Sequence, residues 1–419
     1  MEVSPGYKQT EIGVIPEDWS VKSLGTLGDV LIGLTYAPSD VRRYGTIVLR
    51  SSNIQNDALA FEDNVFVDME IPERIMVRTG DVLICVRNGS RPLIGKTALL
   101  DERTNGMTFG AFMAVFRSDH GQYINYMFRS NMLKRQINEH LGATINQITN
   151  KSLNSFEIPV PPTDGEVEAI GTALSDVDAL LDAIEQLITK KRDLKQAAMQ
   201  QLLTGKTRLP GFEGEWERKI LGDYGVFMKG SGIKKDEAKS GEIPCVRYGE
   251  LYTKHHEYIK SFYSFITSDV AKTAVRLKQG DILFAGSGET KEEIGKCAVF
   301  LEECEAYAGG DIVIFRPEEL DSLFLGFYLN TADANQQKSR KGQGDAVVHI
   351  SASALSNLVV YLPIYMKEQT AIASVLSDID AEIVALEQRR AKTASLKQAM
   401  MQELLTGKTR LVKAGALYA

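Results

Sequence analysis

Cysteine and histidine are scarce in this sequence. Its 419 residues include only five histidines and four scattered cysteines (Cys85, Cys245, Cys297 and Cys304), with no C-x-x-C pair. This pattern argues against a disulfide framework or a zinc site. An apolar run of about 18 or more residues, which a membrane span requires, is also missing, and residues 1–18 lack the apolar stretch of a signal peptide. We therefore expect a cytoplasmic protein with reduced thiols and no membrane contact.

Positive charge is not in excess either. The formal net charge is −7 at pH 7. Because DNA binding depends on Lys and Arg at the phosphates, this balance weighs against a protein that holds DNA by itself. A local basic patch or a more basic partner would compensate. With 44% hydrophobic and 25% charged residues, the composition is that of a globular chain with two or three domains.

An internal repeat dominates the sequence. Residues 194–209 read LKQAAMQQLLTGKTRL and residues 396–411 read LKQAMMQELLTGKTRL, so 14 of 16 positions match. The repeat extends upstream to about residues 163 and 365, and we call residues 163–209 and 365–411 the tails. Upstream of the tails the halves agree only at scattered framework positions, such as Trp19 with Trp216 and Gly95 with Gly295. Each half is therefore a variable domain followed by a nearly identical tail. The boundaries that we predict are 1–162 and 210–364 for the variable domains, 163–209 and 365–411 for the tails, and 412–419 for a C-terminal segment.

The tails have the pattern of long helices. No proline occurs from Asp164 to Leu203, and apolar residues recur in both tails at alternating intervals of four and three. They are Ile170, Leu174, Val177, Leu181, Ile184 and Ile188 in the first tail, and Ile372, Leu376, Ile379, Ile383 and Leu386 in the second. This heptad spacing is typical of a coiled coil. We predict that the two helices pack against each other in antiparallel fashion. The alternative is that each helix packs only on its own domain.

The variable domains have the pattern of an α+β fold, which gives two tandem mixed domains with pseudo-twofold symmetry. Short β-branched runs separated by turn residues predict strands, and two longer amphipathic runs predict helices at Ile124–Leu141 and Leu323–Lys338. The predicted strands are Thr46–Leu49, Val82–Val86, Thr97–Leu100 and Ala111–Phe116, then Asp281–Phe284, Cys297–Leu301 and Asp311–Phe315.

Several polar loops between these strands have the residue types that contact DNA. Arg and Asn side chains suit the guanine and adenine edges, and Lys suits phosphate. The candidates are Arg50, Ser51, Asn53, Arg87, Asn88, Ser90, Arg91, Asn146 and Lys151 in the first half, and Arg247, Tyr248, Ser287, Lys291, Lys338, Arg340, Lys341 and His349 in the second. For any one loop the alternative is an ordinary polar turn.

Catalytic motifs are almost absent. The segment from Gly89 to Gly95-Lys96-Thr97 resembles a phosphate-binding loop but has one residue too many between the glycines. No N/D-P-P-Y/F methylase tetrad occurs. Asp281, Glu289 and Lys291 form D-x(7)-E-x-K, which resembles the metal-binding acids of many nucleases. Both halves contain the Gly-Asp dipeptide, as Gly80-Asp81 and Gly280-Asp281, so a turn explains Asp281 better.

The order of these motifs is similar to that of a known family. Ile15-Pro16-Glu17-Asp18-Trp19 is followed by EIPVPP at Glu157–Pro162, LSDVDALLDAIEQ at Leu174–Gln186 and LLTGKTRL at Leu202–Leu209, and the series then repeats. This arrangement resembles the specificity subunit of type I restriction–modification systems over nearly the whole chain. One departure is Val167, where the second tail has Gln369 as the family does.

The resemblance implies two target-recognition domains that each read half of a bipartite double-stranded DNA sequence, with paired helices that set the spacing. It also implies two methyltransferase subunits and restriction subunits as partners. S-adenosylmethionine, ATP and Mg²⁺ would then belong to those partners, and this chain would hold no cofactor or metal. The family gives no fixed base-contacting residues. Two alternatives remain, a nuclease using Asp281, Glu289 and Lys291, and a scaffold that binds only proteins.

Overall fold

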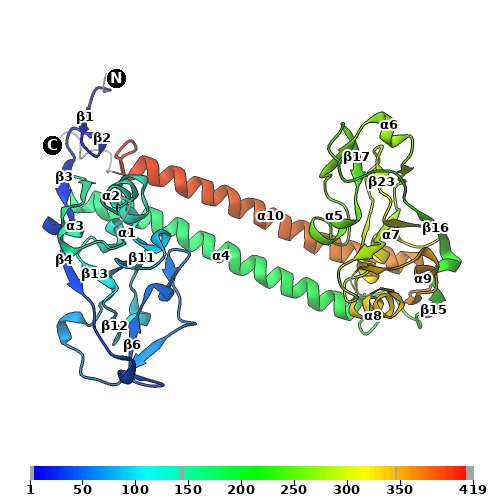
Figure 1. Cartoon of the computed structure of the whole chain (residues 1–419), viewed down its shortest axis with the longest axis horizontal. Coiled ribbons are helices and arrows are strands. Elements are labelled where there is room, and N and C mark those ends of the chain that lie inside the picture. Colours follow the sequence, from blue (N-terminus) through cyan, green and yellow to red (C-terminus); the bar gives the residue numbers. More distant parts are fainter. Residues whose placement is uncertain (1–3, 142–145, 345–346, 412–419) are drawn as a thin grey trace. The chain divides into compact units, whose positions relative to one another are not determined.

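The chain divides into two compact units. The computed structural model describes residues 4–141, 146–344 and 347–411. Unit 1 comprises Met1–Glu185 and Gln388–Ala419, and unit 2 comprises Gln186–Glu387. The long helices α4 (Asp164–Leu202) and α10 (Met366–Leu404) each contribute to both units (Figure 1). Each unit thus contains one variable region and a portion of each long helix.

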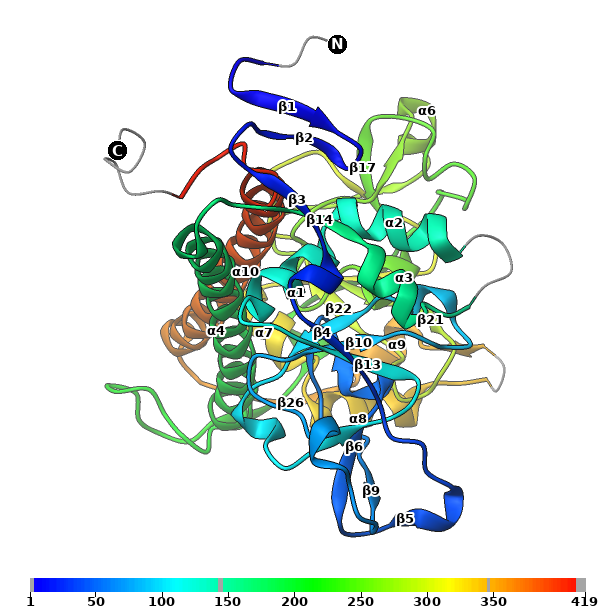
Figure 2. The ribbon, with the colours of Figure 1, turned by 90° about the vertical axis from the view of Figure 1, so that its left-hand side faces the viewer.

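Unit 1 is built around two four-stranded sheets. One has the strand order β11-β10-β13-β4, and the other has the order β12-β6-β9-β5. The strands are β1 (Tyr7–Thr10), β2 (Gly13–Pro16), β3 (Ser20–Ser23), β4 (Asp29–Ile32), β5 (Val41–Arg42), β6 (Thr46–Leu49), β7 (Ile54–Gln55), β8 (Ala58–Leu59), β9 (Val65–Val67), β10 (Val82–Cys85), β11 (Thr97–Leu99), β12 (Thr108–Phe109), β13 (Met113–Arg117) and β14 (Glu157–Val160). The short helices are α1 (Gly121–Arg129), α2 (Asn131–Leu141) and α3 (Asn150–Ser155). In Figure 2, which faces unit 1, α2 lies alongside β14.

Unit 2 repeats this architecture. Its first sheet has the order β16-β24-β20-β22 and its second has the order β18-β17-β23-β19. The strands are β15 (Glu217–Ile220), β16 (Gly225–Lys229), β17 (Ile243–Val246), β18 (Ser264–Ile266), β19 (Val275–Arg276), β20 (Ile282–Ala285), β21 (Ser287–Gly288), β22 (Cys297–Val299), β23 (Tyr307–Ala308), β24 (Ile312–Pro317), β25 (Val348–His349) and β26 (Val359–Leu362). The short helices are α5 (Tyr248–Thr253), α6 (Ser268–Ala271), α7 (Ser322–Tyr328), α8 (Ala332–Lys341) and α9 (Ala352–Ser356).

The two units share the centre of each sheet and differ at an edge. β24 pairs with β16 and β20 as β13 pairs with β4 and β10, always antiparallel. In the second sheet, β6 and β17 each have one parallel and one antiparallel neighbour. The edge strand β5 joins β9 in unit 1, whereas β19 joins β23 in unit 2. The repeat in the sequence is therefore a repeat of topology, and the seven predicted strands lie on strands of these sheets.

The two predicted shorter helices are each interrupted. Ile124–Leu141 is divided between α1 and α2 because Ser130 is extended, with ψ at 154°. Its hydroxyl accepts a hydrogen bond from the N–H of Leu133 at 3.3 Å and so starts a new helix. Leu323–Lys338 is likewise divided between α7 and α8 by Thr331, which caps α8. In both units the apolar periodicity predicted one continuous helix. A polar residue that caps the second helix divides it into two.

The long helices are present in the described structure with the predicted apolar stripe. Ile170, Leu174, Ile372 and Leu376 are buried in the cores of their own units. Ile184, Ile188 and Ile383 are also buried. Val177, Leu181, Ile379 and Leu386 are half-buried. Gly205 and Gly407 follow the helices with φ of +67° and +71°, which is the left-handed conformation that favours glycine at a helix end.

None of the helices in the described ranges is long and apolar enough to cross a membrane.

Candidate nucleic-acid interface

An ion pair between an arginine and a buried aspartate supports the same turn in each unit. Arg316 Nε and Nη2 donate to the two carboxylate oxygens of Asp281 at 2.7 and 2.8 Å, and the backbone N–H of Lys278 donates to the same carboxylate at 2.7 Å. This hydrogen bonding raises the pKa of Arg316. In unit 1, Arg117 and Asp81 form the equivalent pair at 2.9 and 2.7 Å. Asp281 is therefore a turn residue, as the duplicated Gly-Asp dipeptide indicated.

The positions of Asp281, Glu289 and Lys291 do not support the nuclease alternative. Asp281 is fully buried, whereas Glu289 and Lys291 are exposed. Over the residues that the structure describes, no cluster of three or more His, Cys, Asp or Glu side chains could hold a metal ion. The three residues of the D-x(7)-E-x-K pattern therefore do not form a common site.

The loop at Arg50 is held by one buried amide. Asn53 is fully buried; its Oδ1 accepts from the Arg50 N–H at 2.8 Å, and its Nδ2 donates to the Ala60 carbonyl at 2.9 Å. This side chain supports the loop and is not accessible to DNA, which removes it from the candidates. Arg50 itself is half-buried and pairs with Asp63 at 2.9 Å. Ser51 is half-buried beside it.

The structure brings this loop to the second predicted loop of unit 1. Asn88 Nδ2 donates to Ser51 Oγ at 3.2 Å, and Asn88 Oδ1 accepts from the Ser90 N–H at 2.9 Å. Arg87 is exposed and its guanidinium lies 5.0 Å from the ring centre of Phe112. Arg91 is exposed and reaches the carbonyl of Asn138. Arg87, Asn88 and Ser51 thus belong to one surface.

A third segment of unit 1 joins the same surface. Arg87 forms a β-bridge with Gln147, and the Ile148 N–H donates to the Val86 carbonyl at 2.8 Å. Asn146 and Lys151 flank this contact and are exposed. Three of the predicted stretches of unit 1 therefore converge, although they are far apart in the sequence.

In unit 2, the predicted residues Ser287 and His349 meet. β21 and β25 pair these residues directly, and Ser287 Oγ lies 2.9 Å from His349 Nδ1. Both side chains line a cavity of about 320 Å³, together with Lys229 and Asp311. Lys229 and Asp311 were not among the sequence candidates, and both are exposed. This cavity holds donors, an acceptor and a histidine within one small region.

The other candidates of unit 2 are dispersed. Arg247 caps α5, and Tyr248 is 37% exposed at its start. Arg340 is exposed and Lys341 is half-buried at the end of α8. Lys338 is fully buried and donates to the carbonyls of Gly295 and Leu329 at 2.8 Å each. Burial lowers the pKa of Lys338 to about 8. This lysine is structural, which removes it from the DNA candidates.

Sequence reasoning also missed exposed apolar positions of unit 1. Phe112 is 59% exposed and Ile32 is 63% exposed. Neither residue type suggested a contact with DNA; Phe112 lay in the predicted strand Ala111–Phe116, and Ile32 lay in none of the predicted strands. The two halves also align at Phe116 and Phe315, and counting back four residues from this pair matches Phe112 with Asp311, which signals that the residue type varies there.

The portions of α4 and α10 that share a unit are joined by ion pairs. In unit 1, Asp178 lies 2.5 Å from Lys397, and Glu185 lies 2.5 Å from Arg390. In unit 2, the pairs are Lys191 with Glu382, Arg192 with Glu387, and Lys195 with Asp380. From Asp178 to Glu185 the partner on α10 falls from Lys397 to Arg390, and from Arg192 to Lys195 it falls from Glu387 to Asp380, so the helix portions run antiparallel within each unit.

The nearly identical tails make the same contacts twice. Arg410 in unit 1 donates to the buried Glu166 at 2.6 Å, and Arg208 in unit 2 donates to the buried Glu368 at 2.5 Å. The hydrogen bond to Glu166 raises the pKa of Arg410. These arginines attach the end of one tail to the first turn of the other helix. The arginine of the LLTGKTRL motif therefore has the same structural role in both tails.

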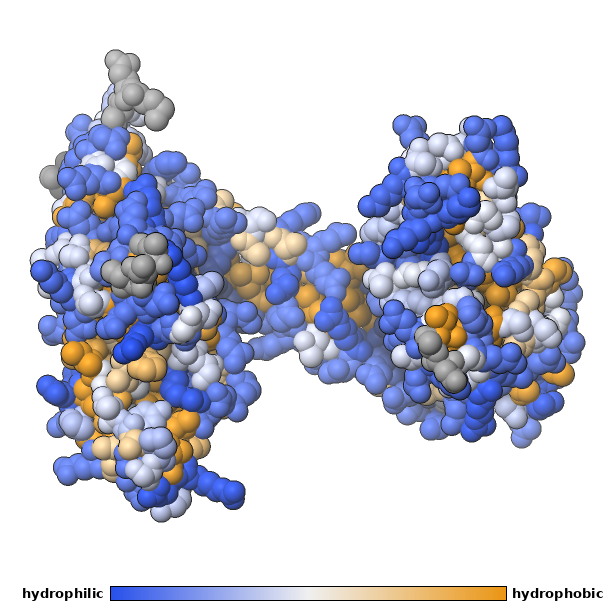
Figure 3. All heavy atoms as spheres, in the orientation of Figure 1, coloured by the Kyte–Doolittle hydropathy of each residue, from blue (hydrophilic) through white to orange (hydrophobic). Residues whose placement is uncertain are grey.

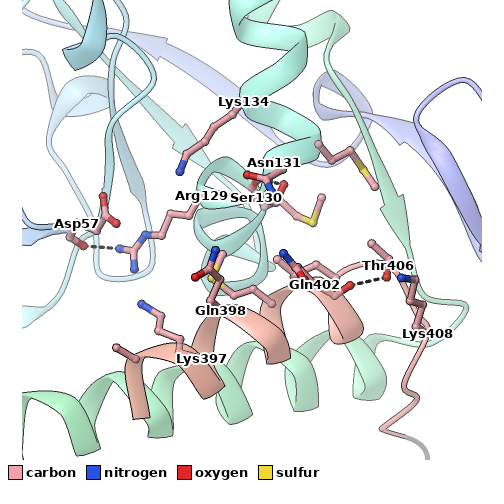
Figure 4. A pocket seen from close by; sticks show the side chains of 15 residues that line it. Asp57, Arg129, Ser130, Asn131, Lys134, Lys397, Gln398, Gln402, Thr406 and Lys408 are labelled. Atoms are coloured by element: carbon pink, nitrogen blue, oxygen red, sulfur yellow. Dashed lines mark hydrogen bonds between the residues drawn. The ribbon is translucent and has the colours of Figure 1, made fainter. Parts of the chain in front are cut away.

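Each unit also has a groove beside the end of its tail. The groove in unit 1 has a volume of about 470 Å³ and lies between α10 and the junction of α1 and α2 (Figure 4). The groove in unit 2 has a volume of about 610 Å³ and lies between α4 and the junction of α7 and α8. Six lining residues are the same in both tails, namely Gln196 and Gln398, Met199 and Met401, Gln200 and Gln402, Leu203 and Leu405, Thr204 and Thr406, and Lys206 and Lys408.

The rest of each groove differs. Arg129 and Lys134 line the groove of unit 1 together with Gln398 and Gln402, and Arg129 donates to the carbonyl of Asp57 (Figure 4). Trp216, Tyr328 and Tyr361 line the groove of unit 2. The long helices also carry apolar surface (Figure 3), and Leu187 and Leu194 are 41% and 50% exposed. The tails thus provide a surface that occurs twice, which suits two copies of one binding partner.

Known proteins resemble the chain over almost its whole length. It is 24% identical to the putative type I restriction enzyme MjaX specificity subunit of Methanocaldococcus jannaschii, covering 97% of both chains. It is also 24% identical to the type I restriction enzyme EcoKI specificity subunit of Escherichia coli, covering 94% of this chain and 90% of the other. The crystal structure of the type I restriction–modification S subunit from M. genitalium has a similar fold, with a TM-score of 0.59, 14% identity, and coverage of 96% and 98%.

A family model matches both halves separately. The model, described as the type I restriction modification DNA specificity domain, matches residues 16–195 and 213–397. Each match includes one variable region and most of the helix that follows it. The chain therefore belongs to the family of type I restriction–modification DNA specificity proteins.

Proposed function

We propose that the chain is the DNA specificity subunit of a type I restriction–modification complex. Each variable domain, residues 1–162 and 210–364, reads one half of a bipartite double-stranded target. The observation that carries the proposal is that both units share a sheet topology and the Asp–Arg turn support but present different loop residues. A reader of two unlike half-sequences needs this combination of constant scaffold and varied surface.

In this proposal the chain itself is not an enzyme. The carboxylate of Asp281 is occupied by Arg316, which argues against a metal-dependent nuclease. S-adenosylmethionine, ATP and Mg²⁺ are assigned to the methyltransferase and restriction partners. The complex acts where its DNA substrate lies, in the cytoplasm.

The tails, residues 163–209 and 365–411, act as spacer and docking platform. We infer that α4 and α10 pair along their length as an antiparallel coiled coil and so set the distance between the half-sites. The equivalent ion pairs of Asp178 with Lys397 and of Asp380 with Lys195 support a pseudo-twofold arrangement. The two similar grooves would then receive two identical methyltransferase subunits.

A domain exchange tests the proposal. Residues 20–160 are replaced by the corresponding domain of another family member, and the chain is assembled with the methyltransferase subunit. Sequencing of methylated sites should reveal a change in one half-site and an unchanged second half-site. A change in both halves would contradict the assignment of one half-site to each domain.

Two further results bear on the alternatives. DNA methylation or cleavage by the chain alone would refute the non-catalytic role. Binding that ignores DNA sequence even in the assembled complex would instead favour a scaffold for proteins. The unexchanged chain, assayed in parallel with the same partner, is the control for assembly.

A further inference from the structure

The same three backbone segments converge in both units. In unit 1, the Val86 N–H donates to the carbonyl of Phe112 at 3.2 Å, and the Val86 carbonyl accepts from the Ile148 N–H at 2.8 Å. In unit 2, Gly286 takes the place of Val86, with hydrogen bonds of 2.8 Å to Asp311 and 3.0 Å from Ile350. The segments come from the end of a central strand, the turn before the next strand, and the stretch before a short helix.

Side chains on this shared backbone differ at four equivalent positions. Because Val86 and Gly286 bind the carbonyls of Phe112 and Asp311, Phe112 is equivalent to Asp311. The residues that follow Val86 and Gly286 make Arg87 equivalent to Ser287. The bridge of Arg87 to Gln147 and the pairing of Ser287 with His349 give the third position. Strand register gives the fourth position. Ile32 pairs with Ala114, two residues after Phe112, and Lys229 pairs with Val313, two residues after Asp311, so Ile32 is equivalent to Lys229. The four positions are 32/229, 87/287, 112/311 and 147/349.

These positions are presented to solvent. Ile32, Arg87, Phe112 and Gln147 are all exposed in unit 1, as are Lys229, Asp311 and His349 in unit 2. Only Ser287 is buried, beneath its hydrogen bond to His349. The four residues of unit 2 line one cavity, so a single ligand edge can reach Lys229, Asp311 and His349, and Ser287 acts through its hydrogen bond to His349. Constant backbone with varied, exposed side chains is the arrangement expected for recognition.

The residue types match base edges better than phosphates. In unit 1, the exposed Phe112 ring can contact a thymine methyl group, and Arg87 and Gln147 can bind guanine and adenine edges. In unit 2, Lys229 donates, and the carboxylate of Asp311 accepts from an amino group of cytosine or adenine. The carboxylate of Asp311 repels phosphate, and the ring of Phe112 is not attracted to it. Neither residue is therefore suited to a contact with the DNA backbone.

We propose that these four positions determine which bases each half of the target contains. Ile32, Arg87, Phe112 and Gln147 specify one half-site, and Lys229, Ser287, Asp311 and His349 specify the other. The inference rests on the proposed function and adds the residues responsible. Asp311 requires an amino-bearing base at the position that it reads.

The experiment uses the full chain assembled with its methyltransferase subunit on a double-stranded DNA library of randomised sequence. Methylated molecules are sequenced for the parent, for Asp311→Ala and for Arg87→Ala. They are also sequenced for a fourfold variant that combines Lys229→Ile, Ser287→Arg, Asp311→Phe and His349→Gln. We expect Asp311→Ala and Arg87→Ala each to lower discrimination about tenfold at one position, in opposite half-sites. The fourfold variant should acquire a different second half-site while the first remains unchanged.

Matched control variants distinguish a failure of the four-position proposal from a failure of the proposed function. Asp269→Ala and Arg74→Ala remove the same charges from other exposed sites of the same units and should leave both half-sites unchanged. If the parent complex lacks any split sequence preference, the proposed function fails. If the parent has such a preference and Asp311→Ala and Arg87→Ala retain it, only the four-position inference is overturned. A uniform loss on all sequences would also overturn it.

A variant that does not assemble is replaced by a conservative one. Asp311→Asn retains the shape of the side chain but converts a pure acceptor into a group that also donates. It should change the preferred base at one position of one half-site. An unchanged preference would overturn the inference. Co-purification of the methyltransferase subunit measures assembly for every variant.

Discussion

The ammonium group of Lys195 lies 2.9 Å from Oδ1 of Asp380, a carboxylate that is almost fully buried. Glu257 lies 3.0 Å from the same ammonium, and the ring centre of Phe327 lies 5.4 Å from it. Burial opposes the charge of Lys195, but the two carboxylates outweigh burial and raise the lysine pKa. In unit 1, Lys397 contacts Asp178 and the ring of Tyr126 in the equivalent way. Each unit thus joins α4 to α10 through one such lysine–aspartate pair, and the aspartate is more deeply buried in unit 2 than in unit 1.

Removing Lys195 should therefore be costly. Lys195→Met leaves Asp380 buried without its partner, and we expect the free energy of unfolding to fall by about 3 kcal/mol in urea titrations. Lys195→Met combined with Asp380→Asn should recover most of this loss. Arg192→Met, which removes an exposed pair on the same helix, should cost about 0.5 kcal/mol. Equal losses for Lys195→Met and Arg192→Met would contradict a special role for the buried pair.

Lys338 should make stability depend on pH in an alkaline range. Its pKa is lowered from 10.5 to about 8 by burial, so between these values the unfolded state holds more protons than the folded state. Stability from this group therefore rises with pH across that window, by up to about 3 kcal/mol. The difference in unfolding free energy, wild type minus Lys338→Met, should increase from pH 8 to pH 10. Lys341→Met, at the end of the same helix, is the control. A difference that stays flat with pH would contradict the lowered pKa of Lys338 in the folded chain.

The sequence predicted the regular elements better than the site. The heptad of Ile170 and Leu174 predicted a long helix because its apolar stripe repeats over many turns. The repeat assigned Asp281 to a turn because Asp81 stands in the same place. The break at Ser130 escaped the prediction because one hydroxyl that caps a helix does not alter apolar periodicity. The described structure locates that cap.

The candidate DNA residues were predictable by type but not by exposure. Asn53 and Lys338 have suitable chemistry, yet both are buried where their polar atoms bind backbone groups. Phe112 has no polar group, so composition gave no reason to select it. Whether a loop side chain points outward depends on contacts between distant segments, such as Arg87 with Gln147, which one sequence does not reveal.

The two grooves predict a stoichiometry. Gln402 and Gln200 are exposed at equivalent places in the grooves of unit 1 and unit 2. If the proposed function holds, Gln402→Trp and Gln200→Trp should each fill one groove and leave one bound methyltransferase subunit in place of the proposed two. The double variant should bind none. Mass measurement of the purified complexes gives the count, with Gln55→Trp as an exposed control outside both grooves. Two bound subunits in the double variant would refute docking at the grooves.

The glycines of the repeated tail motif should differ in their tolerance of alanine. Both Gly205 and Gly407 adopt left-handed backbone conformations, so a methyl group costs about 1 kcal/mol at either position. At Gly205 the added Cβ would lie 3.3 Å from the Trp216 ring, a contact that small shifts relieve. At Gly407 it would lie 2.5 Å from Pro16 Cγ, and the rigid proline ring cannot move aside.

Gly407→Ala should therefore destabilise unit 1 more than Gly205→Ala destabilises unit 2, by roughly 1–3 kcal/mol for the overpacked contact. Hydrogen exchange of the two units in each variant measures the losses separately. Gly407→Ala combined with Pro16→Ala should recover the part that comes from the clash and leave the backbone cost. Equal losses for the two single variants would mean that backbone conformation alone requires glycine in this motif. The greater loss at Gly407 would instead show that identical tail sequences meet different neighbours, because only unit 1 places a proline against the turn.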